Sequence, residues 1–218
     1  MSKVVIKYFS QAFFTLSDKD TSIFIDPYSK IAGLNPPKFS KDPDILLITH
    51  EHQDHNNREY KGENTFEICN PGEYDVKEVI IQGIETYHDK NKGQDRGFNT
   101  IYSINFNKVN FAHLGDLGQK LTKEQLEELS VVDVLFVPVG GHFTIDYKEA
   151  AEIVNDINPS IVVPMHYKTD KTKDLPLEGV DKFLEEYGVT PQEVDVLEVD
   201  EKDFEDEDIE TRVVVFKN

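Results

Sequence analysis

Short apolar runs separated by polar turns make up the first half of the chain. The last two of these runs are separated by only two residues, which predicts a β-hairpin. Runs rich in β-branched and aromatic residues predict strands at 4–9, 12–16, 23–25, 45–48, 65–69, 78–84, 100–106 and 109–112.

Helical patterns appear in the second half of the chain. Thr122 begins the sequence pattern of a capping box, so a short helix is expected from there to about Ser130. Asp146, with Glu149 three positions later, predicts the start of a second helix with an apolar stripe behind it. A third apolar stripe ends at Gly188, a residue typical of helix C-termini. Strands are expected around these helices at 132–139, 161–163, 194–198 and 212–216.

This order of elements predicts a single domain over residues 1–218, in which two packed sheets carry helices on the outside. Two polar segments interrupt the pattern. The segment 28–42 is rich in Pro, Gly and Lys and is expected to form part of a pocket rim. The segment 90–97 contains glycines and is expected to be a flexible loop.

Composition narrows the class of protein. Of the 218 residues, 38% are hydrophobic and 30% charged, as in a globular protein with a sizeable core. The formal net charge of −19 disfavours a nucleic-acid partner, because phosphate backbones need a basic surface. Part of this charge lies in the run 200–210, which is expected to be a solvated acidic turn. The chain has one cysteine, no long apolar run and no signal-peptide pattern. It is therefore expected to be cytoplasmic and not to associate with a membrane.

Ligand-type side chains are concentrated directly after the predicted strand 45–48. His50, His52, Asp54 and His55 fall within six positions. Imidazole and carboxylate groups together suit zinc and related metals. Two of the histidines are two residues apart and so point the same way in an extended segment, whereas Asp54 and His55 come where the chain turns. One short loop can therefore face two metal ions.

The pattern His50-x-His52-x-Asp54-His55 resembles the signature of the metallo-β-lactamase-fold hydrolases. The resemblance extends over nearly the whole chain and is strongest to the compact zinc-dependent branch related to the ascorbate-6-phosphate lactonase-like proteins. It implies an α/β fold, the four-layer αββα sandwich, with the site at one edge of the sheets. The other matching segments are 23–27, 87–89, 113–118, 138–141 and 164–167.

Spacing alone does not choose the distant ligands from the strand-end residues His88, His113, Asp116, His142 and His166. The resemblance implies that His50, His52 and His88 hold one metal. It implies that Asp54, His55 and His166 hold the other, and that Asp116 bridges the two.

Three residues keep open roles. His113 either replaces His88 as a ligand or donates a hydrogen bond to the substrate, and we place it with Asp54 among the catalytic residues. His142 is either a substrate contact or proton donor, or an ordinary loop histidine. Asp26 either caps its turn or orients a metal-ligating histidine. Ser10-Gln11 and Asn56-Asn57 stand where relatives often carry Gly-His and a glycine.

The expected activity is hydrolysis of an ester-like bond in a small molecule: a lactone, a phosphodiester or a thioester. Two metals would share a water and lower its pKa to about 7, with Asp54 orienting it. Zinc is the expected cofactor, and Mn²⁺, Fe²⁺ or Ni²⁺ suit the same ligands. The alternative is a non-catalytic metal-binding or interaction module on the same fold.

Overall fold

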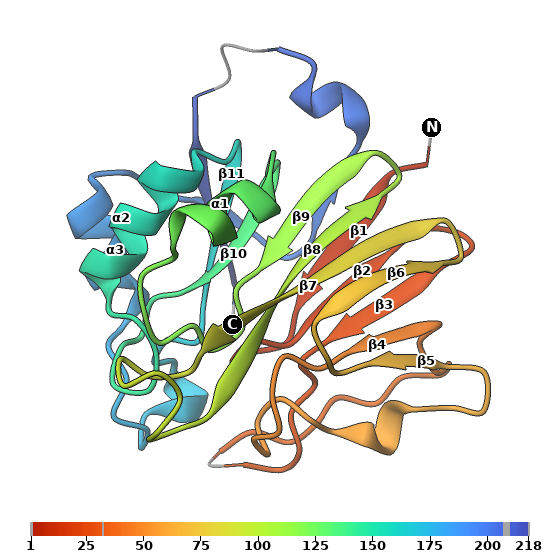
Figure 1. Cartoon of the computed structure of the whole chain (residues 1–218), viewed down its shortest axis with the longest axis horizontal. Helices are drawn as coiled ribbons and strands as arrows, with labels where there is room; N and C mark the ends of the chain where they lie inside the picture. Colours follow the sequence, from red (N-terminus) through yellow and green to blue (C-terminus); the bar gives the residue numbers. More distant parts are fainter. Residues whose placement is uncertain (1, 32, 207–209, 218) are drawn as a thin grey trace.

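The structure is a computed structural model that describes residues 2–31, 33–206 and 210–217. Within these residues, two sheets face each other (Figure 1). The smaller sheet has the strand order β13-β1-β2-β3-β4-β5. Its strands are β1 Val4–Tyr8, β2 Phe14–Ser17, β3 Ser22–Ile25, β4 Ile45–Leu47, β5 Phe66–Ile68 and β13 Leu197–Val199.

The larger sheet has the order β12-β14-β11-β10-β9-β8-β7-β6. Its strands are β6 Gly72–Val76, β7 Val79–Tyr87, β8 Phe98–Phe106, β9 Val109–His113, β10 Val134–Pro138, β11 Ile161–Met165, β12 Gln192–Val194 and β14 Arg212–Phe216. The helices α1 Lys123–Leu129, α2 Tyr147–Ile157 and α3 Val180–Tyr187 lie together on the side of the larger sheet (Figure 1).

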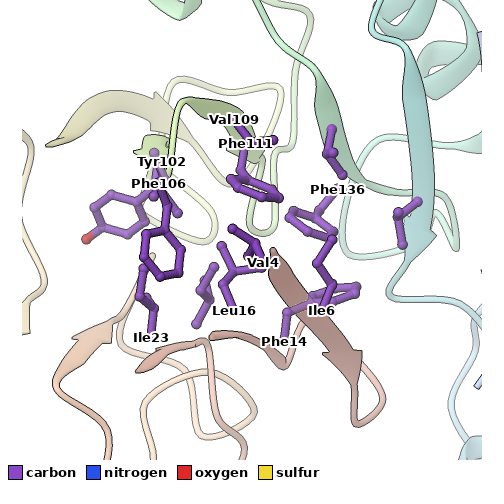
Figure 2. Close-up of a cluster of buried hydrophobic side chains, with 14 of the residues drawn as sticks. Val4, Ile6, Phe14, Leu16, Ile23, Tyr102, Phe106, Val109, Phe111 and Phe136 are labelled. Atoms are coloured by element: carbon purple, nitrogen blue, oxygen red, sulfur yellow. The ribbon is translucent and has the colours of Figure 1, made fainter. Parts of the chain in front are cut away.

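The main core lies between the two sheets, where side chains from both inner faces meet (Figure 2). Phe14 of β2 packs against Phe136 of β10 with ring centroids 4.3 Å apart. Burying each large apolar side chain contributes about 1.5–3 kcal/mol, so this interface is a major source of stability. The Tyr102 hydroxyl crosses between the sheets and donates to the Ile48 carbonyl at 2.9 Å. This bond holds β8 against the end of β4, where the histidine loop begins.

The outer faces of the sheets are covered differently. On the larger sheet, α2 buries Ala150, Ile153 and Val154. The predicted capping boxes of α1 and α2 are both present, which confirms where these helices begin. On the smaller sheet, Phe24 and Leu46 are covered by the loop after β3 and by the short 3₁₀ helix Arg58–Tyr60. The αββα arrangement and the α/β class are thereby confirmed, with a loop-rich layer on the second side.

Two strand predictions differ from the structure. The predicted strand 194–198 is wrong, because β12 ends at Val194 and pairs with β14, whereas β13 starts at Leu197 and pairs with β1. The chain crosses between the sheets at this point, and Val196 is 40% exposed rather than part of a buried run. The sequence pattern also does not predict β6, a polar edge strand formed by antiparallel pairing with β7. Pairing with a neighbour overrides weak strand propensity in such cases.

The acidic run 200–210 begins with a 3₁₀ helix, Glu201–Phe204, capped by Asp200. Residues 207–209 of that run lie outside the described residues. Among the described residues, no helix combines the length and apolar character needed to cross a bilayer.

Candidate metal centre

The ends of several strands converge at one edge of the sheets. In the larger sheet, β7 and β9 are each antiparallel to β8, and β9, β10 and β11 are parallel, so β7, β9, β10 and β11 all run the same way. Their carboxyl ends therefore meet at one edge, and His88, Asp116 and His166 follow three of them. In the facing sheet β4 ends just before the loop that carries His50.

The structure brings all seven predicted ligands together. Their ligand atoms form one group from His50, His52 and His88 and another from Asp54, His55, Asp116 and His166, each group within 4.8 Å. Asp116 lies between the groups. Its carboxylate oxygens are 3.3 Å from His55 Nε2, 3.3 Å from His88 Nε2, 3.5 Å from His166 Nε2 and 3.9 Å from His50 Nε2.

These distances fit metal ions. Two atoms bound to the same tetrahedral ion at about 2.1 Å lie about 3.4 Å apart, close to the separations observed around Asp116. The Nε2 atoms of His50 and His55 and Oδ1 of Asp116 are buried without a well-aligned hydrogen bond in the described chain. Buried polar atoms normally have partners, and metal ions would supply them here. The residues present therefore fit a metal centre, although their ligand roles stay a prediction.

The charges of the cluster also suit cation binding. Burial opposes ionisation of Asp116, but His166 and His55 outweigh it and hold the pKa of this carboxyl well below its ordinary value. Burial and the neighbouring His55 lower the pKa of His50, which keeps it neutral, as a ligand must be. Burial opposes protonation of His55 as well, yet Asp116, Asp54 and Asp26 raise its pKa well above normal. Protons and metal ions therefore compete for His55, and metal affinity falls as the pH is lowered.

Asp26 holds the histidine loop from behind. Its Oδ2 accepts hydrogen bonds from His55 Nδ1 at 2.8 Å and from Thr49 Oγ1 at 2.6 Å, and its Oδ1 accepts from Thr49 N at 2.8 Å. These contacts support the second role considered for Asp26, because it holds the start of the histidine loop at Thr49 and orients His55. With Nδ1 donating to Asp26, Nε2 of His55 faces Asp54 and Asp116. Asp26 is also close enough to His50 and His55 to be a ligand itself, but its oxygens are already used.

Asp26→Asn is expected to weaken metal binding about 10–100-fold, the usual effect of losing the acceptor behind a ligating histidine. The amide would present a donor to His55 Nδ1 or Thr49 in place of a carboxylate oxygen. Competition with a chromogenic chelator measures the change. Asp133→Asn is the matched control, because Asp133 is also a buried carboxylate that accepts a backbone hydrogen bond, from Asn110 at 2.7 Å, but at the opposite end of β10. Equal metal affinities in both variants would contradict the role of Asp26.

His88, and not His113, completes the first group. His113 is fully buried, its Nε2 lies 2.9 Å from the Ala12 carbonyl oxygen, and its Nδ1 accepts from Gly115 N at 3.2 Å. Both ring nitrogens are thereby used for backbone contacts, which disfavours the predicted role of His113 as a metal ligand or substrate contact. Its position supports the turn that leads to Asp116. His142 is exposed, with a φ of 59°, and lines a cavity beside the cluster.

Two residues that shape the site were not predicted as site residues. Gln11 is buried, and its Nε2 lies 3.5 Å from Asp54 Oδ2 and 3.4 Å from His166 Nε2. The only signal for it was the departure Ser10-Gln11 from the relatives' pattern. Asn99 accepts from Asp116 N at 3.0 Å and thereby positions the central carboxylate. Gly115, the residue before Asp116, has a φ of 55°. A Cβ at position 115 would lie only 2.3 Å from Asn99 Oδ1, so only glycine fits this turn.

A cavity of about 380 Å³ opens onto the cluster. Its polar edge includes His52, Asp54, His88 and Asp116. Ile31 also lines it, as expected for the segment 28–42. The remaining lining residues are Gln11, Gln53, Arg96, Phe143 and Leu175. A pocket of this size suits a small molecule.

Known proteins are similar to this chain in sequence and in fold. The sequence model of the β-lactamase superfamily domain matches residues 5–166. A UPF0173 metal-dependent hydrolase of Pyrococcus horikoshii is 30% identical over 76% of this chain and 85% of its own length.

Solved structures of similar fold also include metal-dependent hydrolases. A candidate zinc-dependent hydrolase of the metallo-β-lactamase superfamily from Thermotoga maritima superposes with a TM-score of 0.79, at 34% identity and 98% coverage of each chain. A metallo hydrolase of Ignicoccus hospitalis shares the fold, with a TM-score of 0.61 at 24% identity, over 85% of this chain and 91% of its own.

Proposed function

Because this chain belongs to the metallo-β-lactamase superfamily of metal-dependent hydrolases, we propose that it uses two metal ions to hydrolyse an ester-like bond of a small molecule. The single observation that carries this proposal is the position of Asp116. Its carboxylate lies within 3.3–3.9 Å of histidine nitrogens from both ligand groups, at the edge of an open cavity.

These two groups of side chains support the proposed ligand roles. His50, His52 and His88 would hold one ion, and Asp54, His55 and His166 the other, with Asp116 shared. When bound, such a pair of ions lowers the pKa of a water to about 7 and polarises the bond to be cleaved. Zinc is the first choice for this ligand set, and Mn²⁺, Fe²⁺ or Ni²⁺ are compatible with it.

Asp54 is the residue best placed to orient the attacking water. Its Oδ2 lies 3.6 Å from His55 Nε2 and 3.7 Å from His166 Nε2, while its side chain remains 28% exposed at the cavity. One carboxylate oxygen can thus face the cluster while the other accepts a hydrogen bond from water. Apolar Ile31, Phe143 and Leu175 line other parts of the cavity and favour a substrate with an apolar portion.

The proposal is tested by metal analysis of purified protein, combined with a screen of lactones, phosphodiesters and thioesters. We expect about two bound metals per chain and metal-dependent turnover of at least one class. His52→Ala should lower that turnover about a hundredfold or more without unfolding the protein, because the His52 side chain is exposed. Circular dichroism and thermal unfolding of the variant check its fold.

The alternative module on the same fold gives a different result. It would retain bound metal and a normal fold but turn over none of the substrates in the screen. Full turnover by His52→Ala would also remove the basis for the catalytic proposal.

A further inference from the structure

Arg96 lines the candidate substrate cavity, and its guanidinium has no carboxylate partner among the residues that the structure describes. It lies on the loop between β7 and β8 and lines the 380 Å³ cavity together with His52 and Asp116. It also lines an adjoining cavity of about 270 Å³ that shares His88 and Phe143 with the first. Arg96 therefore borders both of these cavities, and it also lines a third cavity of about 510 Å³.

The other two arginines of the sequence have polar partners. Arg58 pairs with Glu51 and Glu67, and Arg212 donates to Gln192. Within the part of the chain that the structure describes, no carboxylate lies within salt-bridge distance of the Arg96 guanidinium. Its Cζ lies instead 4.7 Å from the centre of the Phe143 ring. An arginine that stacks on an aromatic ring keeps the edge of its fork free for an anion.

The acidic side chains beside Arg96 in the adjoining cavity are already engaged. Glu149 pairs with Lys90 at 2.6 Å. Asp146 caps α2 by accepting from Lys148 N and Glu149 N. On the other side, Asp54 and Asp116 belong to the proposed metal centre. The net charge of −19 supplies many carboxylates, yet none in the described ranges pairs with the Arg96 guanidinium.

The loop that carries Arg96 is closed on itself. Segment 90–97 was predicted to be flexible, but the buried Asp89 carboxylate accepts four backbone hydrogen bonds from it. The donors are Asn91 N at 2.7 Å, Gly93 N at 2.9 Å, Asp95 N at 3.1 Å and Arg96 N at 2.8 Å. His88 N also donates to Gly97 O at 3.0 Å, which ties the loop to the ligand group. The backbone of Arg96 is thus held in place before any ligand binds.

We propose that Arg96 binds an oxyanion group of the substrate, a carboxylate or a phosphate, at a point remote from the bond that is cleaved. The planar guanidinium fork matches either oxyanion with two parallel hydrogen bonds. The inference rests on the proposed function for the identity of the cavity as a substrate site. It adds the chemical class of the substrate, an anionic ester or lactone with an apolar portion.

Binding of substrate-like anions to the zinc-loaded protein tests the inference without requiring turnover. Dicarboxylates from malonate to adipate are compared by calorimetry with monocarboxylates of the same length. One carboxylate would bind at the proposed metal centre, and only the dicarboxylate has a second carboxylate for Arg96. We expect the best dicarboxylate to bind about tenfold more tightly than its monocarboxylate. The matching ω-phosphonocarboxylates show whether carboxylate or phosphate fits better.

Arg96→Gln should abolish the dicarboxylate advantage, and Arg96→Lys, which keeps the charge but loses the fork, should retain part of it. Arg212→Gln removes the same charge from β14 and should behave like the wild type. Equal affinities of dicarboxylates and monocarboxylates in the wild type, or an unchanged advantage in Arg96→Gln, would overturn the inference. Failure of the proposed function appears separately, as absence of turnover in the ester screen.

Discussion

Asp116→Asn is expected to lower turnover about a thousandfold and to reduce the bound metal below two ions per chain. The carboxylate oxygens of Asp116 lie 3.3–3.9 Å from histidine nitrogens of both ligand groups. An asparagine has nearly the same shape but carries no charge and offers a single oxygen. It would therefore weaken both ion sites and leave the surrounding histidines with less compensating negative charge.

Turnover on the best substrate of the screen and metal content by plasma emission spectrometry are the measurements. Asp75→Asn is the matched control, because Asp75 is an exposed aspartate on the edge strand β6 and the substitution removes the same charge. The control should keep wild-type turnover and metal content. An Asp116→Asn variant with full turnover would exclude a shared metal ligand at this position.

Removal of the metal by a chelator should abolish turnover and lower the free energy of unfolding by about 4 kcal/mol, the value expected when free metal exceeds the dissociation constant a thousandfold. The physical reason is the set of buried ligand atoms that make no well-aligned hydrogen bond in the described chain, including His50 Nε2, His55 Nε2 and Asp116 Oδ1. Without a cation these atoms lose their bonding partners, whereas in the unfolded chain water hydrates them.

Denaturant titration of the loaded and the stripped protein measures this difference, and addition of Zn²⁺ to the stripped protein should restore both stability and turnover. The same chelation should change the stability of Asp116→Asn by less, because its sites bind metal more weakly. A protein equally stable and equally active with and without metal would contradict a metal centre at this cluster.

The sequence predicted the ligand loop of the site better than the residues that hold this loop in place. The histidine loop was visible because its ligands lie within six positions, after a run of aliphatic residues. Asp26 was recognised as a candidate support, but its two possible roles could not be separated before its contacts with Thr49 and His55 were known. Asn99 carried no signal, since one asparagine in a strand resembles any other until its side chain meets Asp116 N.

The prediction that segment 90–97 is flexible also depended on a contact that the sequence does not reveal. Residues 90–97 look flexible because glycine and polar residues lower local order, yet one buried carboxylate, Asp89, collects four backbone donors from this segment. The prediction of one strand at 194–198 is wrong because the apolar residues of this segment belong to strands of two different sheets. Local periodicity reports which side chains are apolar, but not which partner strand they meet.

The sequence by itself determined the α/β class, most of the strands, the helix caps and the dense ligand loop from His50 to His55, because each of these depends on residues close together in the chain. Only the tertiary structure placed His88 rather than His113 beside His50 and His52, because both lie at strand ends and the ring nitrogens of His113 meet backbone atoms. It also brought Gln11 and Arg96 to the same cavity. Contacts between residues far apart in sequence are set by strand order and direction, which local patterns do not specify.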